Sequence, residues 1–436
     1  MKSFVENRFG LLALVVVALV ALYGVAYVTR PAAPAAPGQV APRKVAVESV
    51  TVVCPGTKGE KVGVYLPGGL SHETMADAKP HVTKGPAALE AGYTTRATRG
   101  AARGLAGVRC TEPAPVTWLL GPGPANAGVI LHLTNADKAP ALADVQVHAA
   151  EGPVSGDKGI GLEIAPGEHR EIDMRTLAPS ADIMAVSVTT VFGRVAVAAR
   201  TTLETGGVDW LPAAAPPATR VVVPGIPGGG GRRELLVAAP GETDALVRVR
   251  AVSEDAEYAM RGRETVDVPA GSVVSVDVTT GVGGSSAALV LTSETPIVAG
   301  LVMTGTGGRS DIAFTAGTPS LELGSAVARN GTGSRLILTA LGGRPGKVRV
   351  QVVPGKGEAE PPFDVEVPAA RTRNVPLKAK GDFAVVVTPV SGEVYGGRVV
   401  EERLKTGLLI TAQPLAPARM WTLLPPLTDT PHVVQP

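Results

Sequence analysis

Large aromatic side chains are scarce in this sequence of 436 residues: six Phe, six Tyr and three Trp make up only 3% of it. Hydrophobic residues nevertheless reach 45%, so a core must consist of Val, Ala and Leu. This hydrophobicity, together with a formal net charge of only +2, excludes intrinsic disorder, which requires few apolar residues and a high net charge. The near balance of 41 basic and 39 acidic residues also argues against a broad nucleic-acid-binding surface, so we expect no nucleic-acid partner.

Familiar catalytic motifs are missing as well. The chain contains no HExxH, GxSxG or Walker A sequence, and no Cys/His spacing typical of a zinc site. We therefore expect no enzymatic activity, no cofactor and no metal ion. The adjacent carboxylates Glu254-Asp255 and Glu401-Glu402 leave a hydrolase with a nonstandard site as a less favoured alternative, because glycoside hydrolysis needs two carboxylates at a defined separation. Solvated turn or edge charges are the simpler interpretation of these pairs.

Two local features resemble binding sites without meeting their requirements. His132 and His148 fall within expected strands, and a metal pair across a hairpin competes there with two solvent-exposed histidines, which we favour. The tract 228–231 consists of four glycines and precedes Arg232-Arg233, as in anion cradles built from backbone N–H groups. It does not lie between a strand and a helix, so we predict a flexible linker between units.

Glycine and proline are abundant, with 53 and 38 copies, which argues against long helices. The length predicts two to four domains. Alternating Val–polar segments recur at Val145–His148, Val247–Arg250 and Val348–Gln351, at offsets of 102 and 101 positions. A turn and a second Val-rich run follow each of them in the same order and with nearly the same period. The sequence therefore predicts three copies of one unit.

Each unit has an all-β pattern. The second copy contains six short runs rich in Val, Leu and Ile, at residues 234–239, 245–252, 264–268, 272–279, 287–292 and 296–303. Several of these runs alternate apolar with polar residues, as strands with one solvated face do. Such strands predict tandem immunoglobulin-like β-sandwich repeats, stacked as a rod. The predicted boundaries are 119–219 for repeat 1, 220–323 for repeat 2, 324–424 for repeat 3 and 425–436 for a C-terminal tail.

The N-terminus carries one long apolar run. Leu11–Val28 comprises eighteen residues without a charge, close to the lower limit for a membrane-spanning helix. We predict that residues 1–30 form a cytoplasmic stub and a transmembrane signal-anchor. Gly24 and Ala26 place small residues at a potential cleavage site, so secretion after signal cleavage is the alternative.

A Pro/Ala-rich spacer at residues 31–44 separates this run from the rest of the chain. The segment 45–118 that follows is too short for a full copy of the repeat, and we interpret it as a partial β unit. It contains the chain's two cysteines, Cys54 and Cys110. In an oxidising compartment an isolated pair predicts a disulfide, and two unrelated buried thiols are the alternative.

The same segment carries the best candidate for a functional surface, a basic stripe formed by Arg96, Arg99, Arg103 and Arg109. A cationic patch of this kind can bind anionic lipid headgroups or envelope polymers. An ordinary solvated loop would show the same pattern.

Several structural segments resemble those of a known family. They are Val52–Gly56, Arg109–Thr111 followed by Trp118, Val208–Pro212, and Val221–Gly225 leading to Ala239–Glu242. Together they resemble an actinobacterial family of membrane-anchored, extracytoplasmic proteins that is defined only as a domain of unknown function. The resemblance covers most of the chain after the spacer. It implies a surface location and supplies no catalytic residues.

These observations predict a noncatalytic cell-envelope scaffold or binding module. We expect a single-pass protein of the cytoplasmic membrane, anchored through Leu11–Val28, with its C-terminal ectodomain outside the cytoplasm. Its expected partners are the membrane and an envelope polymer or another envelope protein. The alternative is an accessory subunit of a membrane enzyme of envelope glycan assembly.

Overall fold

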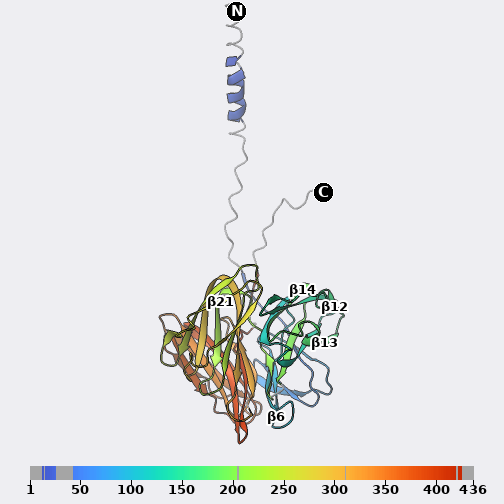
Figure 1. Cartoon of the computed structure of the whole chain (residues 1–436), viewed down its shortest axis with the longest axis vertical. Helices are drawn as coiled ribbons and strands as arrows, with labels where there is room; N and C mark the ends of the chain where they lie inside the picture. The colour runs from blue at the N-terminus through green and yellow to red at the C-terminus, as the bar shows by residue number, and fades with distance from the viewer. Residues whose placement is uncertain are drawn as a thin grey trace, which may run out of the picture. The chain divides into compact units, whose positions relative to one another are not determined.

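The computed structural model describes residues 12–13, 15–25, 43–203, 206–309, 311–418 and 421–424. The chain divides into two compact units, Met1–Ala46 with Trp421–Pro436, and Val47–Met420 (Figure 1). In the first unit, residues 12–13 and 15–25 are helical, and β1 (Arg43–Ala46) pairs antiparallel with β33 (Trp421–Leu424).

The predicted anchor 11–28 lies only partly within the described residues. Across the described ranges, no helix combines the length and the apolarity needed to cross a membrane. Most of the predicted spacer 31–44 and all of the predicted tail 425–436 lie outside the described residues. The last four residues assigned to repeat 3, 421–424, form β33 and so belong to the first unit.

The second unit is all-β, and repeat 1 shows how its strands are arranged. Its elements are β8 (Val116–Pro122), β9 (Ala127–Thr134), β10 (Ala141–Ala149), β11 (Gly152–Pro153), β12 (Leu162–Ile164), β13 (His169–Asp173), the 3-10 turn η1 (Met174–Thr176), β14 (Ile183–Phe192), β15 (Ala196–Leu203) and β16 (Val208–Leu211). One sheet has the order β8–β14–β10, with β11 and β12 both pairing with β10. The other has the order β13–β9–β15–β16.

Repeats 2 and 3 have the same strand order. Repeat 2 comprises β17 (Ala218–Ile226), β18 (Arg233–Ala238), β19 (Ala245–Ser253), β20 (Glu257–Ala259), β21 (Thr265–Val268), β22 (Val273–Asp277), β23 (Ala287–Thr304) and β24 (Ile312–Ala316). Repeat 3 comprises β25 (Ser325–Asn330), β26 (Ser334–Leu341), β27 (Gly346–Pro354), β28 (Phe363–Val367), β29 (Arg371–Pro376), β30 (Phe383–Ser391), β31 (Glu393–Leu404) and β32 (Gly407–Pro414).

In repeat 3 the sheets run β25–β30–β27–β28 and β29–β26–β31–β32. In repeat 2 the first half of β23 lies between β17 and β19, and its second half lies between β18 and β24. The two halves of β23 therefore occupy the positions that two separate strands hold in the other repeats, β14 and β15 in repeat 1 and β30 and β31 in repeat 3. The glycine tract 228–231 connects β17 to β18 inside repeat 2, so the prediction of a linker between units is wrong.

The segment before repeat 1 is a reduced version of the same arrangement, here called the N-terminal sandwich. Its strands are β2 (Val50–Cys54), β3 (Lys61–Leu66), β4 (Gly69–Thr74), β5 (His81–Gly85), β6 (Glu90–Ala97) and β7 (Gly104–Arg109). They form the sheets β2–β5 and β4–β3–β6–β7. This is the order of the repeats without their third and fourth strands, which explains why the sequence reads as a partial unit.

The alternation of side chains explains how each sandwich forms. In β19, Val247 and Val249 are buried while Arg248 and Arg250 point to solvent, because successive side chains in a strand lie on opposite faces. The apolar faces of the two sheets then pack together. Small aliphatic side chains fill these cores, as in the cluster around Leu235 and Leu289, where both residues are fully buried.

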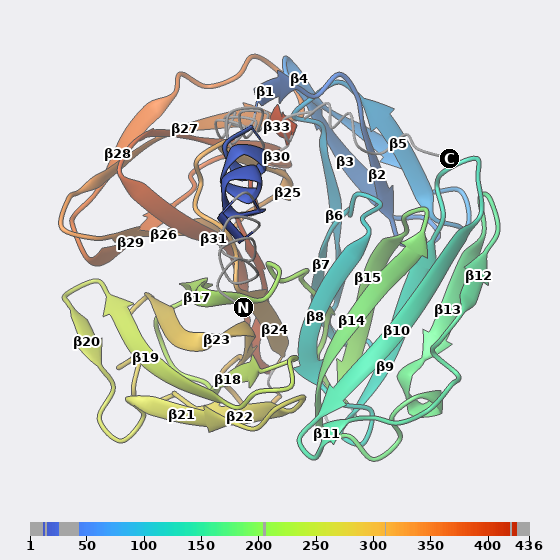
Figure 2. The same ribbon diagram turned by 90° about the horizontal axis from the view of Figure 1, so that it is seen from above.

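The four sandwiches form a closed ring in chain order, and not the rod that we expected (Figure 2). Apolar clusters occupy all four junctions. The residues that share them include Tyr93 with Trp210 (N-terminal sandwich and repeat 1), Trp118 with Leu236 (repeats 1 and 2), Val222 with Leu341 (repeats 2 and 3), and Tyr65 with Ala326 (repeat 3 and the N-terminal sandwich). The rod is excluded because repeat 3 packs back onto the N-terminal sandwich.

The last strand of each sandwich lines the centre of the ring. Strand β7 contacts β16 and β32, and β24 contacts the same two strands, so that four strands from four sandwiches surround one axis. The chain therefore places residues about one hundred positions apart side by side at this axis.

Candidate functional site

The four arginines of the predicted basic stripe do not form one surface. Arg103 is buried, with only 2% of its surface exposed. Arg109 donates from Nε to Oε2 of the buried Glu90 at 2.8 Å and forms an ion pair with the same carboxylate. Only Arg96 and Arg99 are exposed. The expectation that all four face solvent is therefore wrong, because Arg103 packs inward and Arg109 is paired with Glu90.

Arg96 and Arg99 instead belong to a group of basic residues from three hairpin ends. The ion pair between Arg96 and Glu402 joins β6 to β31, with Nε lying 2.6 Å from Oε2. The amide of Arg309 donates to the carbonyl of Thr406, which joins the loop before β24 to the β31–β32 turn. The exposed basic residues gathered there, named the basic end below, are Arg96, Arg99, Arg309, Arg403 and Lys405.

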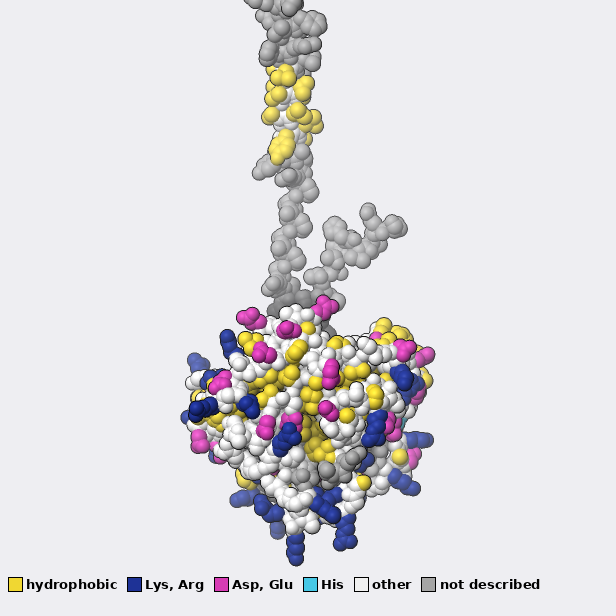
Figure 3. All heavy atoms as spheres, viewed as in Figure 1, with side chains coloured by type: hydrophobic (Ala, Val, Ile, Leu, Met, Phe, Trp, Pro, Cys, Tyr) yellow, Lys and Arg dark blue, Asp and Glu magenta, His cyan; other side chains and the backbone are white. Residues whose placement is uncertain are grey.

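Figure 3 shows Lys and Arg side chains concentrated at the lower end of the visible face, whereas acidic side chains are mixed with them elsewhere. The hydrogen bond with Arg96 lowers the pKa of Glu402, so this carboxylate is charged and neutralises Arg96. The other four cations of the basic end make no ion pair within the described ranges. The basic end therefore has a net positive charge carried on strand ends.

Two buried carboxylates lie at the axis of the ring, and both accept hydrogen bonds from the central strands. Asp311 accepts from the amides of Leu105 and Ile410 at 2.9 Å each. It also accepts from the amides of Ile312 at 2.9 Å and Val208 at 3.3 Å. The donors come from β7, β32, β24 and β16, so one side chain connects the central strands of all four sandwiches.

Asp209 holds a similar position on β16. Its Oδ1 accepts from the amides of Gly107 and Trp210 at 2.9 Å and from the Thr411 hydroxyl at 3.0 Å. Burial raises the pKa of Asp209 well above its usual value, and raises that of Asp311 to about 6. Shifted carboxyl pKa values often mark active sites. Here the shifts accompany backbone hydrogen bonds at a fully buried junction, which indicates a structural role.

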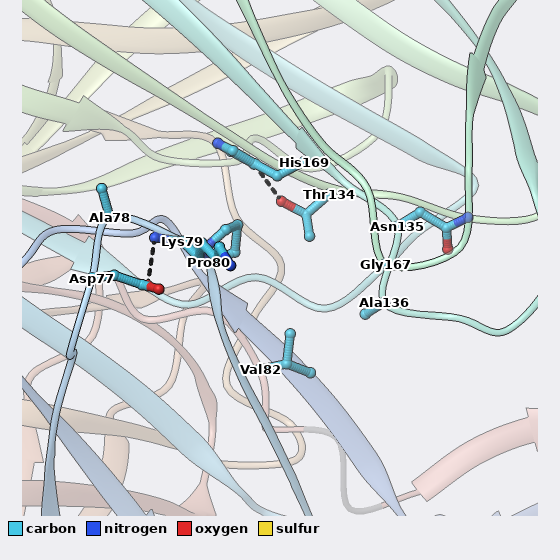
Figure 4. Close-up of a pocket in the computed structure, with 10 residues that line it drawn as sticks. All are labelled: Asp77, Ala78, Lys79, Pro80, Val82, Thr134, Asn135, Ala136, Gly167 and His169. Atoms are coloured by element: carbon cyan, nitrogen blue, oxygen red, sulfur yellow. Dashed lines mark hydrogen bonds between the residues drawn. The ribbon is translucent and has the colours of Figure 1, made fainter.

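A pocket of about 730 Å³ lies between the N-terminal sandwich and repeat 1 (Figure 4). Its lining comes from the β4–β5 loop, from β5, and from the ends of β9 and β13 with their adjoining loops. The lining residues are Asp77, Ala78, Lys79, Pro80, Val82, Thr134, Asn135, Ala136, Gly167 and His169. The Asp77 carboxylate accepts from the amide of Lys79 at 2.9 Å, which fixes the turn on one side of the pocket. On the other side, His169 Nδ1 lies 2.9 Å from the Thr134 hydroxyl.

His169 also belongs to a cluster with His132 and Glu171. Nδ1 of His132 and Nε2 of His169 are 3.4 Å apart, and Oε1 of Glu171 lies 3.5 Å from the first and 3.4 Å from the second. These three residues are the group whose ligand atoms could hold a metal ion among the described residues. Burial lowers the pKa of His132 to about 4, so this imidazole is neutral at pH 7.

The pairing of two strands creates this cluster. In the β13–β9 ladder, Glu171 stands opposite His132, and His169 stands opposite Thr134. His169 and Glu171 are two positions apart on one strand and therefore share a face of the sheet. The sequence suggested His148 and not His169 as the partner of His132, because it does not show that β13 pairs with β9. The alternation of His169 and Glu171 predicts that their side chains share one face of a strand. It does not predict that His132 lies on the neighbouring strand.

His148 is not part of a histidine pair. It lies on β10, in the other sheet of repeat 1 from His132, so the two do not face each other across a hairpin. Its Nδ1 is 2.8 Å from the carbonyl oxygen of Gly271 in repeat 2, and its ring lies 5.7 Å from that of Trp118. Only 2% of its surface is exposed, so the interpretation as a solvent-exposed residue is also wrong.

The two cysteines are joined. Cys54 at the end of β2 and Cys110 directly after β7 form a disulfide, and both are buried in the core of the N-terminal sandwich. The predicted bridge is confirmed. It connects the first and last strands of this reduced sandwich, which lacks two of the strands that stabilise the repeats.

The chain belongs to a family of unknown function (DUF5719), whose profile matches residues 72–378. The match spans parts of all four sandwiches. It confirms the resemblance to a family defined by a domain of unknown function. Comparison with curated proteins gives no significant match.

Proposed function

We propose that this member of a family of unknown function is a noncatalytic binding module of the cell envelope, and that its basic end binds an anionic envelope polymer. Leu11–Val28 would hold it in the cytoplasmic membrane of an actinobacterium, with the ring outside the cytoplasm. The ring would be a tandem array of immunoglobulin-like sandwiches.

One observation carries this proposal: hairpins from the N-terminal sandwich and from repeats 2 and 3 place exposed cations side by side. Arg99, Arg309 and Arg403 are far apart in sequence, and the ion pair and the amide bond described above hold their hairpins together. A cluster of like charges raises the local concentration of a polyanion and binds it without a deep cleft. A polymer that follows the surface suits such an arrangement better than a small ligand does.

The buried disulfide supports an oxidising location. A bridge between Cys54 and Cys110 persists in secreted and extracytoplasmic proteins and is rare in the cytosol. The apolar segment Leu11–Val28 at the N-terminus fits the same location. The noncatalytic role is supported by the hydrogen bonds of the two shifted aspartates: Oδ1 of Asp209 and both carboxylate oxygens of Asp311 accept from the central strands.

Binding of a defined polyanion tests the proposal. Full-length protein in detergent would be titrated with poly(glycerol phosphate), and with dextran of similar length as the neutral polymer. We expect the protein to bind poly(glycerol phosphate) and not dextran. The affinity should fall as the salt concentration rises, because salt screens exposed charges. Replacing Arg99, Arg309, Arg403 and Lys405 by Gln should lower the affinity at least about tenfold, since each cation near an anionic surface contributes about 1 kcal/mol.

A control with the same change in net charge separates the basic end from general electrostatics. It replaces four exposed lysines from other parts of the ring by Gln: Lys138, Lys158, Lys356 and Lys380. We expect this variant to bind within about twofold of the wild type. Equal losses in the two quadruple variants, or binding of dextran, would refute the basic end as the binding surface.

Location and tether need a separate experiment. In intact cells, an impermeant biotin reagent should label Lys405 and other exposed lysines, and alkaline carbonate should leave the protein with the membrane. Exchanging Leu11–Val28 for an unrelated spanning helix should preserve function if the segment is only a tether. Loss of function on this exchange would instead support an accessory subunit that contacts a membrane enzyme through its helix.

A further inference from the structure

The cluster of His132, His169 and Glu171 has the dimensions of a metal site. Its three nearest ligand atoms form an almost equilateral triangle, with sides of 3.4, 3.4 and 3.5 Å. In a tetrahedral zinc site the metal lies about 2.1 Å from its nitrogen and oxygen ligands, so that adjacent ligand atoms are about 3.4 Å apart. A Zn²⁺ ion can therefore contact all three atoms without a rearrangement of the two strands.

The surroundings of the cluster hold the ligands in the state that a metal needs. The Thr134 hydroxyl lies 2.9 Å from Nδ1 of His169. In the tautomer whose Nδ1–H donates a hydrogen bond to this hydroxyl, the lone pair of Nε2 is free to bind a metal. His132 is 9% exposed, and its ring lies 5.3 Å from that of Trp210 and 5.4 Å from that of His169. Burial and these two ring contacts restrict the movement of the His132 imidazole before any ligand binds.

The cluster is also accessible. The Glu171 side chain is 59% exposed, so an ion can enter from solvent and a fourth ligand can bind on the open side. Three protein ligands with one open position are typical of zinc sites that exchange a ligand. His169 in addition lines the pocket between the N-terminal sandwich and repeat 1, which places the cluster at the wall of a cavity of about 730 Å³.

We propose that His132 Nδ1, His169 Nε2 and the Glu171 carboxylate form a binding site for Zn²⁺, with the fourth coordination position open to solvent. Two imidazoles and one carboxylate form a donor set that suits Zn²⁺ better than Ca²⁺ or Mg²⁺, which prefer oxygen ligands. Arg200 on the neighbouring strand β15 disfavours a cation at the site, because its positive charge interacts electrostatically with His132. The site is independent of the basic end and of the polymer proposed for it.

Metal content and affinity test this site directly. Full-length protein carrying a tag without histidines would be stripped with a chelator, loaded with Zn²⁺ and titrated against a chromophoric chelator. We expect one Zn²⁺ per chain, and an X-ray absorption spectrum with two imidazole ligands and light-atom ligands completing the shell. Glu171→Ala and His169→Asn should each weaken binding at least about tenfold, as loss of even an indirect ligand contact can.

A matched control is available in the N-terminal sandwich. Glu73 is 50% exposed, and its Oε2 lies 3.0 Å from Nε2 of His81, so it is a similarly exposed glutamate beside a histidine that belongs to no three-residue cluster among the described residues. Glu73→Ala should leave both the stoichiometry and the affinity unchanged. Because Glu171 is exposed, its alanine variant should unfold at the same temperature as the wild type when no metal is present. Absence of bound Zn²⁺ in the wild type, or equal affinities of the two alanine variants, would overturn the site.

Discussion

The hydroxyl of Thr411 donates a hydrogen bond of 3.0 Å to Oδ1 of Asp209 across the centre of the ring. Their strands, β32 and β16, each contact both β7 and β24, so the two residues come from opposite sandwiches. The same oxygen accepts from the amide of Gly107 on β7 at 2.9 Å. One carboxyl group therefore connects three of the four sandwiches, and the stability of the ring should depend on it and on its neighbour Asp311.

Asp311→Ala should destabilise the whole ring. The substitution leaves the amides of Leu105, Ile410, Ile312 and Val208 without their acceptor at a buried site. Each buried donor that loses its partner costs about 1–3 kcal/mol, so we expect a loss of at least about 3 kcal/mol, measured by thermal or urea unfolding.

Asp267→Ala is the control for this substitution. Asp267 is an exposed residue of β21 in repeat 2, so its replacement should change the unfolding temperature by little. Similar unfolding curves for the two alanine variants would show that the Asp311 carboxylate does not hold the centre together.

Asp209→Asn should become more stabilising, relative to the wild type, as the pH rises. Burial raises the pKa of Asp209 well above its usual value near 4, so in the wild type the folded state keeps a proton that the unfolded chain loses above that pH. The folded state then binds more protons than the unfolded state, and the free energy of unfolding falls with rising pH by up to about 1.4 kcal/mol per pH unit. The amide of Asn does not titrate, and it retains an oxygen acceptor for the three donors of Oδ1.

The measurement is the difference in unfolding temperature between Asp209→Asn and the wild type at pH 5 and at pH 7.5. Burial also lowers the pKa of His132 to about 4, which destabilises the fold as the pH falls below 6.5, but this contribution is present in both proteins and cancels in the difference. A difference that is the same at both pH values would contradict a protonated Asp209. Asp209→Ala, which removes the acceptor, should destabilise the ring at both.

Local periodicity predicts five strands of repeat 2, but it does not mark β17, β20 and β24. The run predicted at 245–252 corresponds to β19 (Ala245–Ser253). It was predictable because its valines, on the buried face, alternate with arginines, on the solvent face. The runs at 287–292 and 296–303 are one strand, β23, which continues through Ser293–Thr295 without a turn. Periodicity marks both halves of this strand but does not show that the backbone stays extended between them.

The ring and its sites depend on contacts that leave no local pattern. Asp311 and Leu105 are 206 positions apart, and no feature near either residue predicts their hydrogen bond. The spacing of Arg103 from Arg99 is that of a solvated stripe, yet Arg103 is buried beside repeat 1, where its carbonyl accepts from the amide of Gly207. By contrast the disulfide was predictable, because a chain with two cysteines allows only one bridge.

Removing the disulfide should destabilise the N-terminal sandwich. Cys54 and Cys110 are 56 positions apart, and closing a loop of that length lowers the entropy of the unfolded chain by an amount equivalent to about 4 kcal/mol. The double variant Cys54→Ala/Cys110→Ala should therefore unfold at a lower temperature than the wild type. Proteolysis should begin within residues 50–109, because the loss of stability is confined to the N-terminal sandwich. A reductant should lower the unfolding temperature of the wild type and leave that of the double variant unchanged. A wild type whose unfolding temperature does not respond to the reductant would contradict the bridge.

Gly397→Ala should open the junction between repeats 2 and 3. A Cβ atom at this position of β31 would lie 2.5 Å from the Cα atom of Gly225 on β17, and backbone cannot move aside as a flexible side chain can. Gly225 has a φ of 80°, so its replacement would add backbone strain, whereas Gly397 is not in the left-handed region and reports on the close approach alone. Overpacking of this kind costs about 1–3 kcal/mol.

Hydrogen exchange should rise in β17 and β31 of the Gly397→Ala variant. Gly331→Ala, which would place its Cβ in open space, should leave exchange unchanged. Protection of β17 equal to that of the wild type would mean that the two repeats do not meet through these glycines, and the ring would then have to close by other contacts.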